Sequence, residues 1–309
     1  MEYYEEYVPI GKLLQYFLHC PAPGSDAVLL YLHGGPGFSA AYHAHLLDTE
    51  RFPCTLVFYD QRGTGKTLWK NRFDPPTFSL LLEDLHSTIS YLKEKYPSKK
   101  ILLLGHSWGS VLGTQYVQKY PDAVSAYIGM GQVINMLRGE KIAFSELKRR
   151  IFSRNKLNDV KKYRQLENRL SFASPAAFQK SSRGLRLLQY RYGFYPKIYT
   201  AVKNVCKSPV FSIKDVFSFL AAPRMNKILN RFLWEFDTTD TCQYALPVYY
   251  ILGKEDWQVP STLAAQHFQQ ICAPIKQLFW IDAAGHSTDI ENPAAFRNAL
   301  QEILRQICD

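Results

Sequence analysis

The chain has 309 residues, of which 47% are hydrophobic, 14% aromatic and 21% charged. This balance excludes a disordered chain and provides enough apolar side chains for a large core. The N-terminus lacks the basic segment and apolar run of a secretory signal. The longest apolar runs, such as residues 101–104 and 248–252, have strand length rather than the roughly 20 residues of a membrane span. We therefore expect no membrane span.

The cysteines are scattered along the chain without a CxxC pair. They are Cys20, Cys54, Cys206, Cys242, Cys272 and Cys308. In a large chain without a signal, such cysteines are expected to be reduced thiols. Reduced thiols are typical of a reducing compartment, and we therefore predict a cytoplasmic location.

The charge is unevenly distributed. The formal net charge is +10, yet residues 138–235 hold 22 Lys and Arg against six Asp and Glu, and the rest of the chain is acidic. A basic surplus can indicate nucleic acid, an anionic membrane surface or an acidic substrate. Because no nucleic-acid-binding motif accompanies it, we interpret it as a solvated helical surface and expect no nucleic-acid partner.

Short apolar runs and helical patterns alternate along the chain. Residues 3–10 and 12–19 are predicted to form a hairpin around Gly11. Further strands are predicted at 27–32, 55–59, 100–104, 124–130, 247–252 and 276–281. Helices are predicted at 80–95, 107–120, 261–271 and 292–307. The order of these elements predicts the fold class.

Continuous apolar strands are typical of parallel sheets that are covered on both faces. Their alternation with amphipathic helices predicts an α/β fold with a mainly parallel central sheet. Residues 132–240 interrupt the alternation, because they are basic, aromatic and mostly helical in pattern. We therefore predict one core domain made of residues 1–131 and 241–309, with residues 132–240 inserted as a helical cap.

A possible nucleophile lies between a predicted strand and a predicted helix. Gly105-His106-Ser107-Trp108-Gly109 has the G-x-S-x-G form. The chain must turn sharply there, and the two glycines leave room where a Cβ atom would collide. The turn projects the serine hydroxyl toward the positive end of the following helix, where a developing anion is favoured. This context is typical of the α/β-hydrolase fold and predicts Ser107 as nucleophile.

A serine nucleophile needs a base and an acid that orients the base, and in this fold they follow in the order Ser, Asp or Glu, His. His286 is the predicted base, because it follows the last predicted strand, whereas His267 falls inside a predicted helix. Asp256 is the predicted acid, because it follows the preceding strand. Three carboxylates are alternatives for the acid: Glu255, Asp282 and Asp289.

The oxyanion of an acyl-transfer reaction needs two backbone N–H donors. One is expected from Trp108, which follows the nucleophile. The other is expected from the glycine-rich loop His33-Gly34-Gly35-Pro36-Gly37, with Gly35 preferred over Gly34 because Pro36 has no N–H. In a second loop, Asp60-Gln61-Arg62-Gly63, we expect Asp60 and Arg62 to form a charged pair.

These three motifs together resemble the proline iminopeptidase family of α/β-hydrolases. The resemblance covers the main domain on both sides of the insertion. It implies removal of N-terminal residues, often proline, from short peptides, a helical cap over the active site, and no metal or cofactor. It also implies acidic side chains that bind the substrate's amino group, commonly one in the cap and one directly after the catalytic aspartate.

The substrate-binding residues depart from this family pattern. Trp257 stands directly after Asp256, and the cap is poor in acids, so that Glu235 and Glu255 are the candidates for binding an amine. Trp257 is the third substrate-binding candidate. The substrate is expected to be a short peptide or another small molecule. Two enzymatic functions remain open, an aminopeptidase and a carboxylesterase with an apolar slot. A non-enzymatic ligand-binding protein of the same fold is disfavoured, because all three triad candidates are present.

Overall fold

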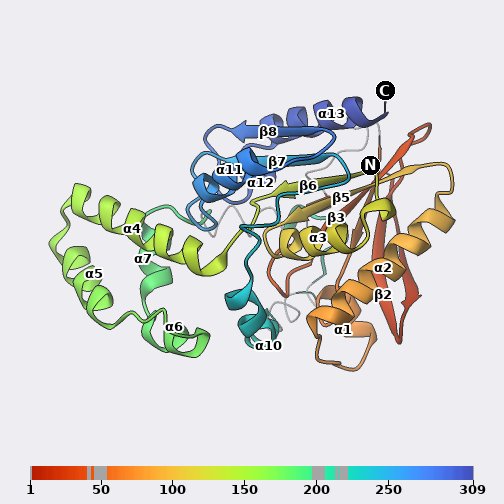
Figure 1. The fold of residues 1–309 in the computed structure, drawn as a ribbon. Coiled ribbons are helices and arrows are strands. Elements are labelled where there is room, and N and C mark those ends of the chain that lie inside the picture. The colour runs from red at the N-terminus through yellow and green to blue at the C-terminus, as the bar shows by residue number, and fades with distance from the viewer. Residues whose placement is uncertain are drawn as a thin grey trace.

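The computed structural model describes residues 2–39, 43–44, 54–196, 206–212, 215 and 222–308. Its centre is an eight-stranded sheet with the order β1-β2-β4-β3-β5-β6-β7-β8 (Figure 1). The strands are β1 Tyr4–Ile10, β2 Leu13–Cys20, β3 Ala27–Leu32, β4 Thr55–Tyr59, β5 Lys100–His106, β6 Ala126–Met130, β7 Val248–Gly253 and β8 Lys276–Ile281. The pairs β1–β2 and β2–β4 are antiparallel, and the other five neighbouring pairs are parallel. The prediction of an α/β fold with a mainly parallel sheet is confirmed.

The central strands are apolar throughout because both of their faces are covered. Every residue of β3, β4, β6 and β7 is buried. Successive side chains of a strand point to opposite faces. Accordingly, Val28 and Leu30 belong to the apolar cluster on one face, and Leu29 and Tyr31 belong to the cluster on the other. A strand of this kind shows no alternation of polar and apolar residues in its sequence.

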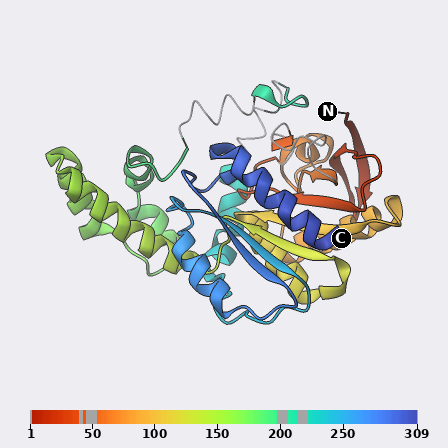
Figure 2. The ribbon, with the colours of Figure 1, turned by 90° about the horizontal axis from the view of Figure 1, so that it is seen from above.

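Helices supply the two covering layers. On one face, α2 (Phe78–Lys95), α3 (Trp108–Lys119) and α11 (Ser261–Gln270) contribute apolar side chains to the first cluster. On the other face, α13 (Pro293–Cys308) contributes to the second and lies across the sheet (Figure 2). The described part of the core also contains the short helices α1 Gly65–Lys70, the 3₁₀ helix Pro121–Ala123 and α12 Thr288–Glu291.

The segment between β6 and β7 forms a separate group of helices. In its described part these are α4 Met136–Arg154, α5 Leu157–Arg169, α6 Pro175–Ser181, α7 Leu185–Arg191 and α10 Ala222–Glu235. Helices α4 to α7 share an apolar cluster of their own, which includes Leu147, Tyr163 and Leu188. The buried α10 side chains Met225 and Leu229 belong instead to the first cluster of the core. Figures 1 and 2 both show α4 to α7 projecting beyond one side of the sheet. We call this group, α4 to α10, the inserted helices.

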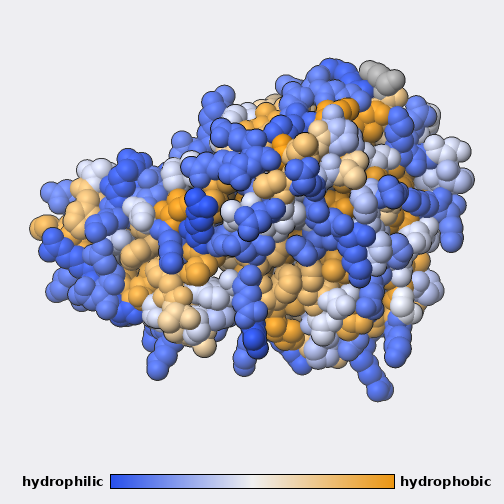
Figure 3. All heavy atoms as spheres, viewed as in Figure 1, coloured by the Kyte–Doolittle hydropathy of each residue, from blue (hydrophilic) through white to orange (hydrophobic). Residues whose placement is uncertain are grey.

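The two ends of the insertion lie side by side at the sheet. Asn135 and Asp237 form an isolated β-bridge, and the Asn135 Nδ2 atom donates to Asp237 Oδ2 at 2.6 Å. The backbone N–H of Thr238 donates to the carbonyl of Ile134 at 2.9 Å. In the space-filling view of Figure 3, apolar side chains gather between the inserted helices and the main body, and hydrophilic side chains cover much of the remaining face.

Among the described residues, no helix is both long and apolar enough to cross a membrane.

Candidate active site

Ser107 lies in a sharp turn between β5 and α3. Its backbone angles are φ 54° and ψ −116°, which residues with a side chain rarely adopt. The flanking glycines are required sterically. A Cβ atom at Gly105 would lie 2.5 Å from the carbonyl oxygen of Gly109, and a Cβ atom at Gly109 would lie 2.1 Å from that of Leu32. The turn therefore sets Ser107 at the carboxyl edge of the sheet and at the N-terminus of α3.

His286 and Asp256 lie in loops that follow the neighbouring strands β8 and β7, at the same edge as Ser107. His286 Nδ1 and Asp256 Oδ2 are 2.8 Å apart, and both side chains are almost completely buried. Asp256 Oδ1 accepts the backbone N–H groups of Gln258 and Val259 at 3.1 and 2.9 Å. These bonds fix the carboxylate and leave its other oxygen to the histidine.

The protonation chemistry of His286 is set by its surroundings. Burial by itself lowers the pKa of His286, but the negative charge of Asp256 and its hydrogen bond outweigh burial, so the pKa is raised above its ordinary value. Nδ1 faces the carboxylate, which assigns the proton of the neutral ring to Nδ1. The buried Nε2 atom has no hydrogen-bond partner in the described part of the chain. It is the nitrogen that can accept a proton.

Buried side chains join the three glycine-containing motifs. His33 Nδ1 donates to the carbonyl of Gly34 at 2.8 Å, and His33 Nε2 accepts the backbone N–H of Gln61 at 3.2 Å. Gln61 Oε1 accepts from Trp108 Nε1 at 2.9 Å. Burial lowers the pKa of His33 to about 4, so the ring stays neutral and keeps both bonds at neutral pH. The loop after β3, the turn after β4 and the serine turn are thereby fixed relative to one another.

The predicted pair between Asp60 and Arg62 is wrong, because each side chain has another partner. Arg62 binds Asp84 of α2 through Nε and Nη2 at 2.9 and 2.8 Å. Asp60 Oδ2 accepts the backbone N–H of Lys66 at 2.7 Å. A carboxylate is stabilised at a helix N-terminus, and Lys66 lies in the first turn of α1. Asp60 thus binds the N-terminus of α1, and Arg62 binds a carboxylate of α2.

The two expected sources of oxyanion donors lie beside Ser107. Gly35 and Trp108 line the same cavity as the serine, and a Cβ atom at Gly34 would lie 3.4 Å from the Cβ atom of Ser107. Trp108 is the first residue of α3, so its N–H has no acceptor within the helix. Gly35 has φ +128°, a conformation that favours glycine.

An open cavity of about 160 Å³ extends from Ser107 to the inserted helices. Its described lining is Gly35, Ser107, Trp108, Val133, Met136, Glu140, Arg186, Tyr195, Leu233, Gln258 and Val259. Within this set the charged side chains are Glu140 of α4 and Arg186 of α7. Arg186 Nη1 donates to Glu140 Oε2 at 3.1 Å and Nη2 donates to Oε1. The Glu140 side chain is 4% exposed, whereas that of Arg186 is 47% exposed.

The sequence interpretation missed this pair. Glu140 is one of only six acids in the basic segment, and it follows β6 by ten residues, close to the sheet edge where the triad candidates lie. Those two signals could have singled it out. Arg186 has no comparable signal, because it is one of 22 basic residues there.

Comparison with known proteins now decides the family. The model of the alpha/beta hydrolase fold matches residues 27–293. The chain belongs to this family. The predicted α/β-hydrolase fold and the resemblance to its proline iminopeptidase-like members are confirmed.

Three similar proteins illustrate the range of the family. The probable aminopeptidase YbaC of Bacillus subtilis is 26% identical over 310 residues, covering 96% of this chain and 94% of that protein. The proline iminopeptidase-related protein of Thermus thermophilus has a TM-score of 0.68 at 21% identity, covering 100% and 99% of the two chains. A thermophilic esterase of Thermogutta terrifontis has a TM-score of 0.60 at 17% identity, covering both chains fully. At such identities the two solved structures show the fold alone.

None of the three substrate-binding candidates is among the described lining residues of the cavity at Ser107. Glu235, at the end of α10, forms an exposed ion pair with Arg231, with Nε and Oε1 at 2.9 Å. Glu255 pairs with Arg150 of α4 at 3.2 Å. Trp257 packs against the apolar cluster of the inserted helices. The structure thus brings Glu140, and not Glu235 or Glu255, into the described wall of the cavity.

Proposed function

We propose that the protein is a serine hydrolase in which Ser107, His286 and Asp256 form a catalytic triad. The observation that supports this most strongly is the buried 2.8 Å contact between His286 and Asp256 at the sheet edge that also holds the strained Ser107 turn. A serine hydroxyl needs such a base, and the base needs an orienting carboxylate. Glu255, Asp282 and Asp289 do not contact His286 in this way.

The reaction follows from these positions. Ser107 Oγ attacks the substrate carbonyl carbon while its proton passes to His286 Nε2. The carbonyl oxygen becomes an oxyanion that accepts the N–H groups of Trp108 and Gly35, with Gly34 as the alternative donor. The tetrahedral species then expels the amine or alcohol, which takes the proton from His286, and an acyl-enzyme remains. Water attacks this ester, its proton passes to His286, and Ser107 is released with its proton restored.

The substrate that we propose first is a short peptide cleaved at its N-terminal residue. The similarity to a probable aminopeptidase over nearly the whole chain supports this reaction. An aminopeptidase needs a carboxylate near the scissile bond to bind the ammonium group. Glu140 is the carboxylate in the cavity wall that fits this role, and the inserted helices, as the cap, supply it.

A specific observation favours carboxylester hydrolysis as the second candidate. Arg186 holds both carboxylate oxygens of Glu140, so the charges in the described cavity wall cancel. An ammonium group would have to compete with a guanidinium that is already bound bidentately, which is the strongest common geometry for such a pair. An uncharged acyl group meets no such competition, and Val133, Met136 and Leu233 offer it apolar surface.

One experiment tests the reaction and separates the substrates. Hydrolysis of proline p-nitroanilide and of p-nitrophenyl butyrate is measured side by side, with Ser107→Ala as the blank. Cleavage of the amide that depends on Ser107 supports the aminopeptidase, and cleavage of the ester alone supports the esterase. A serine-directed fluorophosphonate should label Ser107, as located by mass spectrometry. Stable labelling elsewhere, or normal turnover by folded Ser107→Ala, would refute the triad.

A further inference from the structure

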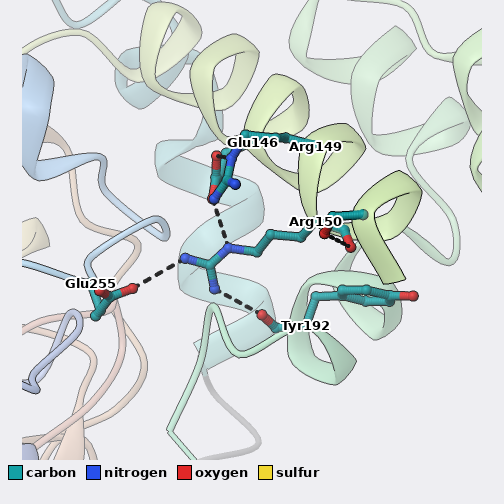
Figure 4. Close-up of polar contacts among 6 residues, drawn as sticks. Glu146, Arg149, Arg150, Tyr192 and Glu255 are labelled. Atoms are coloured by element: carbon teal, nitrogen blue, oxygen red, sulfur yellow. Dashed lines mark hydrogen bonds and ion pairs between the residues drawn. The ribbon is translucent and has the colours of Figure 1, made fainter. Parts of the chain in front are cut away.

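Arg150 of α4 lies at the junction between the inserted helices and the core (Figure 4). Its guanidinium uses all three nitrogens. Nε donates to Glu146 Oε1 at 2.7 Å, Nη1 to the carbonyl of Tyr192 at 3.0 Å, and Nη2 to Glu255 Oε2 at 3.2 Å. The first two partners belong to the insertion, and Glu255 belongs to the loop after β7. One cation therefore connects α4 and the residue that follows α7 to the core.

The core partners of Arg150 stand on either side of the proposed catalytic acid. Glu255 precedes Asp256, and the ring of Trp257, which follows it, lies 5.7 Å from the Arg150 guanidinium carbon. The backbone N–H of Glu255 donates to the carbonyl of Ala284 at 2.9 Å, two residues before His286. Displacement of this loop would therefore move Asp256 relative to the histidine that it orients.

The burial of the partners indicates which contacts are strong. The Arg150 side chain is 17% exposed, and Glu146 is 8% exposed, so the contacts within the insertion are well shielded. Glu255 is 63% exposed. An ion pair with so exposed a partner contributes little to overall stability and weakens as salt is added. The ion pair between Arg150 and Glu255 can therefore adjust the position of the loop after β7. Removing this ion pair should leave the fold intact.

We propose that Arg150 is a positioning residue that couples the placement of the inserted helices to the loop carrying Asp256. This inference rests on the proposed triad. The competing interpretation is an ordinary ion pair between two surface elements with no consequence for catalysis. The two interpretations differ in what removal of Arg150 does to the reactivity of Ser107.

The chain contains a matched control in the neighbouring arginine. Arg149 also binds Glu146, through Nε and Nη2 at 2.7 Å each. Its side chain is 69% exposed, and it hydrogen-bonds to no described residue of the core. Arg149→Met and Arg150→Met thus each remove one guanidinium from the same glutamate, and only the second removes the contact with Glu255.

The test compares the wild type with Arg149→Met, Arg150→Met, Arg150→Lys and Glu255→Gln. Two quantities are measured: the rate constant for labelling of Ser107 by a small uncharged fluorophosphonate, and kcat and KM for p-nitrophenyl butyrate. Thermal unfolding of each variant is recorded alongside. A fluorophosphonate makes few contacts with the cavity, so its labelling rate reports the competence of the triad and not substrate binding.

For Arg150→Met we expect the labelling rate and kcat to fall about fivefold, with a smaller change in KM. Arg150→Lys should recover part of the loss, because an ammonium keeps the charge but not the three-way geometry. Glu255→Gln should lower the labelling rate in the same direction, and it should have no further effect when combined with Arg150→Met. Raising salt from about 0.05 M to about 0.5 M should slow the wild type more than Arg150→Met.

Equal labelling rates for folded Arg149→Met and Arg150→Met would overturn the inference while leaving the triad in place. If Arg150→Met does not fold, the labelling rate of Ser107 in Glu255→Gln is the deciding measurement. A labelling rate equal to that of the wild type in this variant would overturn the inference. A wild type that is not labelled at Ser107 refutes the proposed function, and the inference with it.

Discussion

The sheet edge and the inserted helices hold their functional side chains by different physical means. At the sheet edge, positions are set by backbone sterics and by buried hydrogen bonds, as at Gly105, Gly109 and the bonds to Asp256. In the inserted helices, the side chains near the cavity are held by ion pairs with half-exposed arginines such as Arg186. We therefore expect the proposed triad to be rigidly held, and we expect single charge changes in the inserted helices to alter the proposed substrate selection.

Charge separates the two regions as well. Acids of the insertion that form ion pairs among the described residues include Glu140, Glu146, Asp159, Glu167 and Glu235. The positive surplus of the insertion therefore lies largely in basic side chains beyond those needed to pair its acids. The structure thus agrees with a solvated, basic helical surface around an internally neutral cavity wall.

The largest effect should come from the base itself. His286→Ala should lower kcat on the better of the two test substrates by about 10⁴- to 10⁶-fold, because the proposed mechanism then lacks the base that takes the Ser107 proton. The measurement is steady-state turnover, with unfolding followed in parallel. A folded variant within tenfold of the wild type would show that the sheet edge is not the rigid catalytic region described above.

The next effect should appear in the pH profile of Asp256→Asn. Since Asp256 raises the pKa of His286 above its ordinary value, the acid limb of kcat/KM in the wild type should lie at higher pH than for an unperturbed histidine, and activity should fall as pH drops through it. Removing the carboxylate should move that limb to lower pH and reduce the plateau about 10⁴-fold, because the ring loses its orientation.

The other charged groups near His286 are unchanged in Asp256→Asn, so a shift of the acid limb in this variant reports the loss of Asp256. Glu291 and Asp289 also act to raise the pKa of His286, and both remain in the variant. His106 does not titrate in the same range, because burial, and then the nearby His286, lowers its pKa to about 3. An acid limb that stays in place in Asp256→Asn would contradict the assignment of Asp256 as the orienting acid.

Sequence alone was sufficient where backbone geometry dictates residue type. The turn at Ser107 admits only glycine on both sides, so the G-x-S-x-G pattern between a strand and a helix was a reliable signal of fold and of the serine turn. The apolar strands were predictable for a similar reason, since burial on both faces leaves no alternation. Strand limits shifted slightly, as with β6, predicted at 124–130 and observed at Ala126–Met130.

Sequence was insufficient where the ion-pair partner of a side chain depends on how helices that are distant in sequence pack together. Arg62 pairs with Asp84 rather than Asp60, because α2 packs beside the turn while the start of α1 takes Asp60. Glu140 faces Arg186 only because α4 and α7 meet over the cavity. No local pattern indicates which of 22 basic residues will meet a given acid.

A stability measurement contrasts the two regions directly. Gly109→Ala should destabilise the protein by about 3 kcal/mol or more, because the new Cβ atom would lie 2.1 Å from the rigid carbonyl oxygen of Leu32. Gly139→Ala in α4 is the matched control, since its Cβ atom would lie 3.5 Å from Pro260, an ordinary contact. The control should gain about 0.5–1 kcal/mol from helix propensity. Chemical denaturation measures both, and equal effects would contradict the steric account of the serine turn.

The smallest effect should be a change of preference produced by the cavity pair. Glu140→Gln leaves Arg186 uncompensated and makes the cavity wall positive, so kcat/KM for proline p-nitroanilide should fall roughly tenfold relative to p-nitrophenyl butyrate. Arg186→Met frees the carboxylate and should move the same ratio upward. The measured quantity is the ratio of kcat/KM for the two substrates, because a general loss of activity lowers both values equally and leaves the ratio unchanged.

Glu235→Gln is the control for this change, because it removes an equal charge from an exposed pair outside the described cavity lining. Exposed ion pairs contribute about 0–1 kcal/mol, and this one should leave the substrate ratio unchanged. Opposite shifts for Glu140→Gln and Arg186→Met would show that substrate charge is selected by the insertion while the sheet edge performs the same chemistry throughout. If Glu235→Gln changed the ratio and Glu140→Gln did not, the amine would be bound at the end of α10 rather than at the Glu140–Arg186 pair.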